Sequence, residues 1–159
     1  MDLQSLLIPT LGRAPREIEQ DALCCYTERY CNNCDYSTLV THDEQQVAFY
    51  KNRFDHAFYG RKDWTRSAKK DTPDVNRLCR IRWVEPLVGG EIPRSECWLI
   101  PDDENPRRTR RLYTIHDECF LVWLEQWSPE EWWFSSAYIA LRQQIRAYCK
   151  NGTRIWKRD

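Results

Sequence analysis

The sequence predicts an α+β fold: two N-terminal helices, a small antiparallel sheet of about three strands, and two C-terminal helices. Three observations support it. Apolar residues recur at helical spacing in residues 15–30 and 42–59, alternate with polar ones in 78–85, and return to helical spacing in 117–151. Helices and strands in separate runs are typical of α+β proteins, and 159 residues suit a single domain, 1–159.

The first two predicted helices cover residues 15–30 and 42–59. Pro15 suits the first turn of a helix. Thr41 and Glu44 match a capping box at the start of the second helix, and Gly60 follows its end. The apolar stripes are Ile18, Ala22, Cys25 and Tyr26 in the first helix and Val47, Tyr50, Phe54 and Phe58 in the second.

The predicted sheet lies in the middle of the chain. Residues 78–85 alternate, with Cys79, Ile81 and Trp83 on one side and Arg80 and Arg82 on the other, as in a half-buried strand. Residues 97–100 and 112–115 are short apolar runs that predict two further strands. The polar segment between them predicts a hairpin loop.

The two C-terminal helices are predicted from caps and stripes. Asp117 caps the first, which carries Phe120, Leu124 and Trp127. Residues 128–131 (SPEE) combine a capping box with proline at the first helical position. The second stripe is Phe134, Tyr138, Leu141, Ile145 and Tyr148, and it ends at Asn151 and Gly152.

The chain divides by composition into three regions. Residues 1–60 form a helical region with cysteine and histidine, 61–116 a basic loop with the sheet, and 117–159 a tryptophan-rich helical pair. The net charge is +0, so only the basic middle region is suited to an anion. No secretory signal or apolar run of ~20 residues is visible, so we expect an intracellular, cytoplasmic or nuclear protein without a membrane partner.

Four cysteines within residues 24–34 predict a structural zinc site. Cys31 and Cys34 form a C-x2-C turn that presents two thiolates to one ion. A continuous helix would separate Cys24 from Cys31 by roughly 10 Å, so the helix must break near residue 30. The predicted ligands are Cys25 (or Cys24), Cys31, Cys34 and His42. Two alternatives stay open, buried free thiols and a redox pair.

The stretch Cys31-Asn-Asn-Cys34-Asp35-Tyr36 resembles, over these residues alone, small viral accessory proteins with a cysteine cluster, such as those of bocaviruses and sobemoviruses. The resemblance implies a compact regulatory protein.

Basic and aromatic side chains in the middle region predict single-stranded RNA or DNA binding. Cations neutralise phosphates and exposed rings stack on unpaired bases. Against this, the total charge is zero and charged loops are often merely solvated. The candidates are Tyr59, Arg61, Lys62, Trp64, Arg66, Arg80, Arg82, Arg108, Arg110 and Arg111.

Clustered tryptophans predict either core packing or a protein interface. Neighbours on a helix point about 100° apart, so Trp132 and Trp133 cannot both lie at its buried centre. Exposed tryptophan is typical of interaction hot spots. The candidate partner-binding residues are Trp132, Trp133 and Trp156.

The sequence carries none of the common catalytic motifs, so we expect no enzymatic activity. The alternative is a cysteine hydrolase that uses Cys97 and His116. The favoured interpretation is a small regulatory or accessory protein, of the viral type among others, that acts by binding another protein and is stabilised by zinc. The first alternative is a single-stranded nucleic-acid binder.

Overall fold

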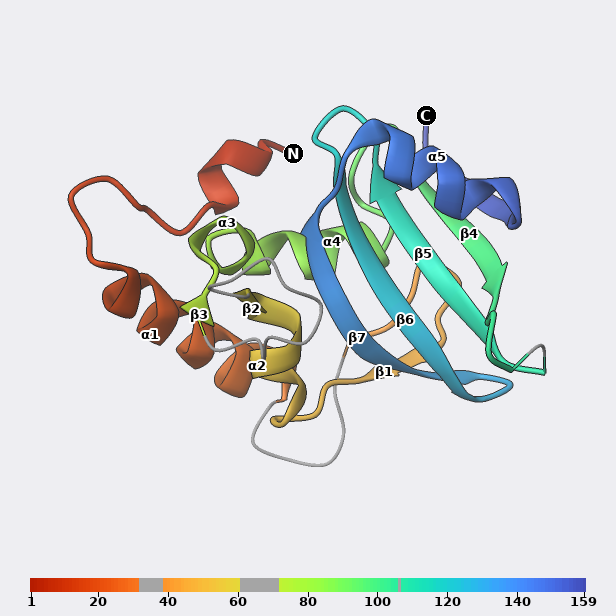
Figure 1. Ribbon diagram of the computed structural model, residues 1–159, viewed down its shortest axis with the longest axis horizontal. Helices are drawn as coiled ribbons and strands as arrows, with labels where there is room; N and C mark the ends of the chain where they lie inside the picture. Colours follow the sequence, from red (N-terminus) through yellow and green to blue (C-terminus); the bar gives the residue numbers. More distant parts are fainter. Residues whose placement is uncertain (32–38, 61–71, 106) are drawn as a thin grey trace.

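A six-stranded sheet dominates the protein (Figure 1). The computed structural model describes residues 1–31, 39–60, 72–105 and 107–159. The strand order is β1-β7-β6-β5-β4-β8, and β1 runs parallel to β7 while the other neighbours are antiparallel. The strands are β1 (Gln46–Ala48), β4 (Ser95–Pro101), β5 (Thr109–Ile115), β6 (Phe120–Ser128), β7 (Glu131–Ile139) and β8 (Thr153–Lys157).

Short helices surround the sheet, and a two-stranded ribbon joins β2 (Tyr59–Gly60) to β3 (Thr72–Pro73). The α-helices are α1 (Pro15–Cys25), α2 (Arg53–Phe58), α3 (Val75–Leu78), α4 (Val84–Val88) and α5 (Arg142–Lys150). A π-turn, η2 (Tyr26–Tyr30), extends α1, and the 3-10 turns are η1 (Leu3–Leu6) and η3 (Ile81–Trp83).

The predicted arrangement of two helices, three strands and two helices is wrong, although the fold is mixed α+β. The helix at 15–30 and the strands at 97–100 and 112–115 are confirmed by α1 with η2, β4 and β5. Of the helix predicted at 42–59, only α2 is helical, because the segment before it supplies β1 to the sheet.

The strand predicted at 78–85 is helical. Asp74 caps α3, its carboxylate accepting from the backbone N–H groups of Asn76 and Arg77. The buried residues Leu78, Ile81, Val84 and Leu87 are spaced by three, which places them on one face of a helix. The same segment also alternates apolar and polar residues, so its sequence is compatible with both a helix and a strand. The helical structure is adopted because it packs these four residues together into the larger core.

The helices predicted at 117–127 and 128–151 are β6, β7 and the shorter helix α5. Five consecutive residues, 120–124, are buried because a central strand is covered on both faces. The stretch that resembles a capping box, residues 128–131, is the turn of the β6–β7 hairpin, where Ser128 pairs with Glu131.

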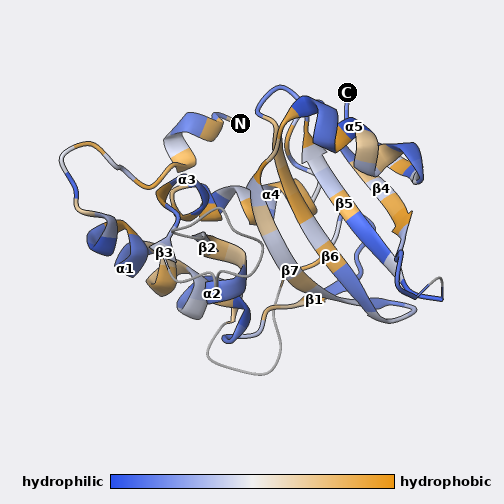
Figure 2. Ribbon diagram, viewed as in Figure 1, coloured by the Kyte–Doolittle hydropathy of each residue, from blue (hydrophilic) through white to orange (hydrophobic). Residues whose placement is uncertain are grey.

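The two faces of the sheet have separate cores. Phe120, Val122 and Leu124 of β6 face the larger core, which α1, α2, α3 and α4 cover. Leu121 and Trp123 face the smaller core beneath Ile145 of α5. In Figure 1, α5 lies across one end of the sheet, away from the β4–β5 and β6–β7 turns. Figure 2 shows that β5 and β6 are more hydrophilic at the end near the β4–β5 and β6–β7 turns than in their middles.

Substitution of Gly90 by alanine tests the close packing between the α4 end and the sheet. Gly90 has φ +75, and an added Cβ would lie 2.8 Å from His42 Cβ and 2.9 Å from Trp156 Cζ2. Left-handed backbone costs a non-glycine residue ~1–2 kcal/mol, and the clash adds to this. We expect Gly90→Ala to lower the free energy of unfolding, measured in urea, by more than ~2 kcal/mol.

Gly12→Ala is the matched control, because Gly12 has φ +70 but no atom within 4 Å of the added Cβ. It should cost only the ~1–2 kcal/mol of backbone strain. Equal losses in the two variants would contradict the packing argument.

Candidate functional site

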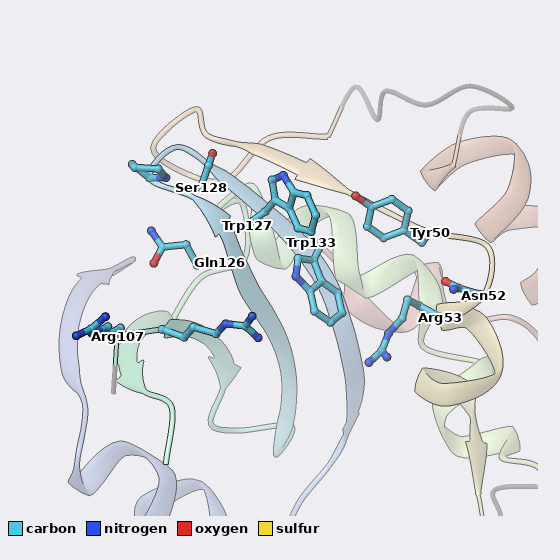
Figure 3. A pocket seen from close by; sticks show the side chains of 10 residues that line it. Tyr50, Asn52, Arg53, Arg107, Gln126, Trp127, Ser128 and Trp133 are labelled. Carbon is cyan, nitrogen blue, oxygen red and sulfur yellow. The ribbon is translucent and has the colours of Figure 1, made fainter. Parts of the chain in front are cut away.

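An open cavity of ≈ 820 Å³ lies at the end of the sheet that carries the β4–β5 and β6–β7 turns (Figure 3). It is bounded by the segment that leads into α2, the β4–β5 turn and the β6–β7 hairpin. We call it the arginine–tryptophan pocket. Its lining residues are Tyr50, Asn52, Arg53, Arg107, Arg108, Gln126, Trp127, Ser128, Pro129 and Trp133.

A β-bulge exposes the first tryptophan of the pocket. Gln126 pairs with Trp132 and Ser128 with Glu131, so Trp127 is an extra residue without a partner on β7. Trp127 is 72% exposed, which is unusual for a large apolar residue. Figure 3 shows Trp127 beside Trp133, with Tyr50 and Arg53 on one side and Arg107 on the other.

The second tryptophan is held in place by an arginine. The Cζ atom of Arg53 lies 4.9 Å from the ring centroid of Trp133, a cation–π contact. Arg53 Nη2 also donates to the backbone oxygen and to Oγ of Ser135, both at 3.2 Å. Tyr50 is anchored through its backbone oxygen, which accepts from the buried Tyr26 hydroxyl at 2.6 Å. Tyr50 as a whole stays 47% exposed.

The pocket is positively charged. Among the described residues that line it, three are arginines and none is aspartate or glutamate. Arg107 and Arg108 are exposed and extend from a turn closed by hydrogen bonds from Arg108 N to Asn105 O and from Asp102 N to Arg108 O. A concave site of one charge sign attracts anions. The pocket therefore offers guanidinium groups and exposed aromatic faces to the same ligand.

An ion pair between the buried Arg111 and the partly exposed Asp43 lies beside Trp132, the neighbour of Trp133 in the chain. The side chain of Arg111 is only 6% exposed. Its two Nη atoms donate to the two Asp43 carboxylate oxygens at 2.7 and 2.8 Å. Its Cζ atom stacks 4.6 Å from the ring centroid of Trp132. The hydrogen bond from Arg111 holds the pKa of Asp43 well below its usual range.

His42 belongs to this buried cluster. Its Nδ1 atom lies 2.8 Å from the Tyr113 hydroxyl, and its ring stacks on Trp156 at a centroid distance of 4.6 Å. Burial lowers the pKa of His42, because desolvation disfavours the charged imidazolium.

The predicted zinc ligands have different neighbours in the structure. Cys25 lines a separate cavity with Arg29 and Arg82, Cys31 is buried in the large core, and His42 contacts Tyr113 and Trp156. Cys34 lies outside the described residues. In residues 1–31, 39–60, 72–105 and 107–159, no group of three or more His, Cys, Asp or Glu side chains could hold a metal ion. Zinc stays a prediction from the sequence.

The predicted nucleic-acid-binding residues are dispersed. Arg61, Lys62, Trp64 and Arg66 lie outside the described residues. The Tyr59 hydroxyl donates to Glu19, Arg80 stacks on Trp83, and Arg82 lies on η3 instead of beside Arg80 on a strand. Arg111 is buried. Arg108 lines the pocket, and Arg110 stacks on Trp123 nearby on the sheet.

Of the predicted partner-binding tryptophans, only Trp133 lines the pocket. Trp132 is buried and its Nε1 donates to Gln45, while Trp156 packs on His42. Sequence reasoning missed Trp127, Tyr50 and Arg53 as site residues. The sequence signal for Trp127 is Pro129: interpreted as part of a hairpin turn over residues 128–131, it places Trp127 at the end of a strand, next to the turn.

The structure separates the predicted catalytic pair. Cys97 is fully buried, and desolvation raises the pKa of its thiol to about 12. His116 Nε2 lies 2.9 Å from Oε2 of Glu96, the neighbour of Cys97 on β4. Adjacent strand residues point to opposite faces, so His116 and Cys97 lie on opposite sides of the sheet.

Comparisons with protein-family models, with curated proteins and with solved structures found no match. Within the part of the chain that the structure describes, no helix is long and apolar enough to cross a membrane.

Removal of the Asp43 charge tests the buried ion pair. Asp43→Asn leaves the Arg111 guanidinium buried without a counter-ion, so we expect urea unfolding to show a loss of ~2–3 kcal/mol, below the ~3–5 kcal/mol of fully buried pairs because Asp43 is partly exposed. The control is Asp117→Asn in the exposed pair with Arg94, which should cost less than ~1 kcal/mol. A loss no larger than in the control would refute a stabilising role for the pair.

The buried histidine predicts a pH dependence of stability. The pKa of His42 is lowered on folding, so its contribution is complete above the unfolded value of ~6.5 and is lost as the pH falls below it. We expect the free energy of unfolding to fall between pH 7.5 and pH 5.5, and to fall less in His42→Gln. If both proteins lose the same amount over this range, His42 is not the group responsible.

Proposed function

We propose that this chain is a non-enzymatic binding protein that holds single-stranded nucleic acid in the arginine–tryptophan pocket. One observation carries the proposal: Trp127, Trp133 and Tyr50 share an open pocket with Arg53, Arg107 and Arg108, and no carboxylate of the described residues lines it. This pocket differs from the surface predicted from the sequence, with which it shares Arg108.

The two kinds of side chain suit the two parts of a nucleotide. The exposed ring of Trp127 offers a face on which an unpaired base can stack, a contact worth ~1–3 kcal/mol per base. Arg107 and Arg108 are both exposed, so their guanidinium groups are free to contact the phosphates that flank the base. A base inside a duplex is stacked on both of its faces and offers none to Trp127, so single strands are favoured.

The lining residues support binding without catalysis. Besides the arginines and aromatic residues they are Asn52, Gln126, Ser128 and Pro129. As far as the structure describes the chain, none of them is a histidine, cysteine or carboxylate that could act as a general base. The neutral amides suit hydrogen bonds to base edges.

A protein partner is the second candidate. Trp127, Pro129 and Tyr50 form an exposed apolar group of the kind found at interaction hot spots. This alternative keeps the regulatory or accessory role. Binding of a protein through apolar contacts would depend weakly on salt, whereas binding to phosphates depends on it steeply.

Fluorescence anisotropy with a labelled 12-nucleotide single strand tests the proposal. Arg107→Ala/Arg108→Ala should weaken binding at least tenfold and lower the slope of log K against log salt by about 1.4, or ~0.7 per lost phosphate contact. Trp127→Ala should weaken binding by roughly five- to a hundredfold through lost stacking.

The matched control is Arg142→Ala/Arg146→Ala, which removes two exposed arginines from α5, away from the pocket. It should leave affinity and salt slope close to those of the parent protein. Equal losses in the two double variants would point to non-specific attraction, and absence of binding to any single strand would reject the proposed function.

A further inference from the structure

A second pocket, of ≈ 210 Å³, lies beside the first and is built around another β-bulge. Trp123 pairs with Ser136 and Leu124 with Phe134, so Ser135 is an extra residue in β7. Consecutive residues of a regular strand point to opposite faces, but a bulge can turn both to one side. Ser135 and Ser136 both line this cavity, which we call the serine pocket.

The serine pocket adjoins the arginine–tryptophan pocket. Glu125, which lines the serine pocket, is the strand partner of Trp133, which lines the larger one. Directly paired residues have Cβ atoms ~5 Å apart on the same face. Arg53 also connects the two, because it stacks on Trp133 and donates to Ser135. The two pockets are therefore neighbours on the same face of the sheet.

The side chains of the serine pocket are suited to a hydroxyl group. Glu125 Oε1 accepts from Ser135 Oγ at 3.3 Å, which orients the carboxylate. Neither Glu125 Oε2 nor Ser136 Oγ has a hydrogen-bond partner among the described residues. The carboxylate can only accept, and Oε2 is not among the buried atoms without a partner, so a sugar hydroxyl can donate to it in place of water.

Two further residues of the lining, Trp123 and Arg110, fit a sugar next to a phosphate. Trp123 supplies an apolar wall, and Arg110 lies over its ring with Cζ 4.8 Å from the centroid. Arg110 is the strand partner of Glu125, so its positive charge lies near the carboxylate and reduces the repulsion that a phosphate attached to the sugar would meet. The volume is below the ~300 Å³ at which pockets begin to hold larger ligands, and suits one sugar.

We propose that the serine pocket binds the ribose of a single-stranded RNA, with the 2′-hydroxyl donating to Glu125 and accepting from Ser136. This inference rests on the proposed function and deepens it. The 2′-hydroxyl is the group by which a protein distinguishes RNA from DNA. The pocket makes the protein an RNA binder that discriminates against DNA of the same sequence.

The test compares three labelled 12-nucleotide strands of one sequence: RNA, DNA and 2′-O-methyl RNA. Anisotropy at fixed salt should show RNA bound about tenfold more tightly than DNA, which one hydrogen bond to a charged acceptor can supply. Methylation removes the donated proton, so 2′-O-methyl RNA should bind like DNA. This comparison uses the parent protein alone, so its result does not depend on whether a variant folds.

Two variants assign the discrimination to the pocket. In Glu125→Gln and in Ser136→Ala the ratio of the DNA to the RNA dissociation constant should fall toward one, and in the exposed-site control Ser5→Ala it should stay near ten. Circular dichroism confirms that each variant is folded.

The outcomes separate the two proposals. Equal binding of RNA and DNA by the parent protein overturns the inference and leaves nucleic-acid binding in place. A preference for RNA that survives in both variants also overturns it, because the discrimination then comes from elsewhere. Failure to bind any of the three strands overturns the proposed function, and the inference with it.

Discussion

The buried guanidinium of Arg111 joins three segments that the chain keeps far apart. It extends from β5, stacks on Trp132 of β7 and binds Asp43, which lies just before β1. Strand β1 has three residues and pairs only with β7 among the described strands, so its ladder alone is a weak attachment. The ion pair and the hydrogen bond from Trp132 to Gln45 secure this edge. Because Trp132 is held inside, Trp133 is directed to the opposite face, where it lines the pocket.

Both pockets depend on irregularities in the β6–β7 hairpin. One bulge leaves Trp127 unpaired and exposed, and the other turns Ser135 and Ser136 toward a common cavity. A regular hairpin of these two strands would have alternated its side chains strictly and would have buried or dispersed them. The bulges sit on a sheet whose other face is packed against a large core. The candidate site therefore combines local departures from the ladder with a rigid support, which limits the entropy lost when a ligand binds.

Arginine–aromatic stacking recurs over the face that carries the pockets. Arg53 lies over Trp133 and Arg110 over Trp123. A stacked guanidinium keeps its planar edge available for hydrogen bonds while its long side chain is already ordered. Helix α5 covers only one end of this face, over Leu121 and Trp123, so the turn end stays accessible to a ligand as far as the described residues extend.

The sequence by itself determined those helices and strands whose pattern of apolar residues is compatible with only one type of secondary structure. Residues 15–30 have a helical stripe, and residues 97–100 and 112–115 have short apolar runs, and these became α1 with η2, β4 and β5. It also singled out Arg108 and Trp133 by composition. Only the tertiary structure decided that residues 120–139 are strands, because burial on both faces replaces alternation with a continuous apolar run. Only the tertiary structure brought Tyr50 and Arg53 to Trp127 and Trp133, because strand pairing and the position of α2 join residues that no local pattern connects.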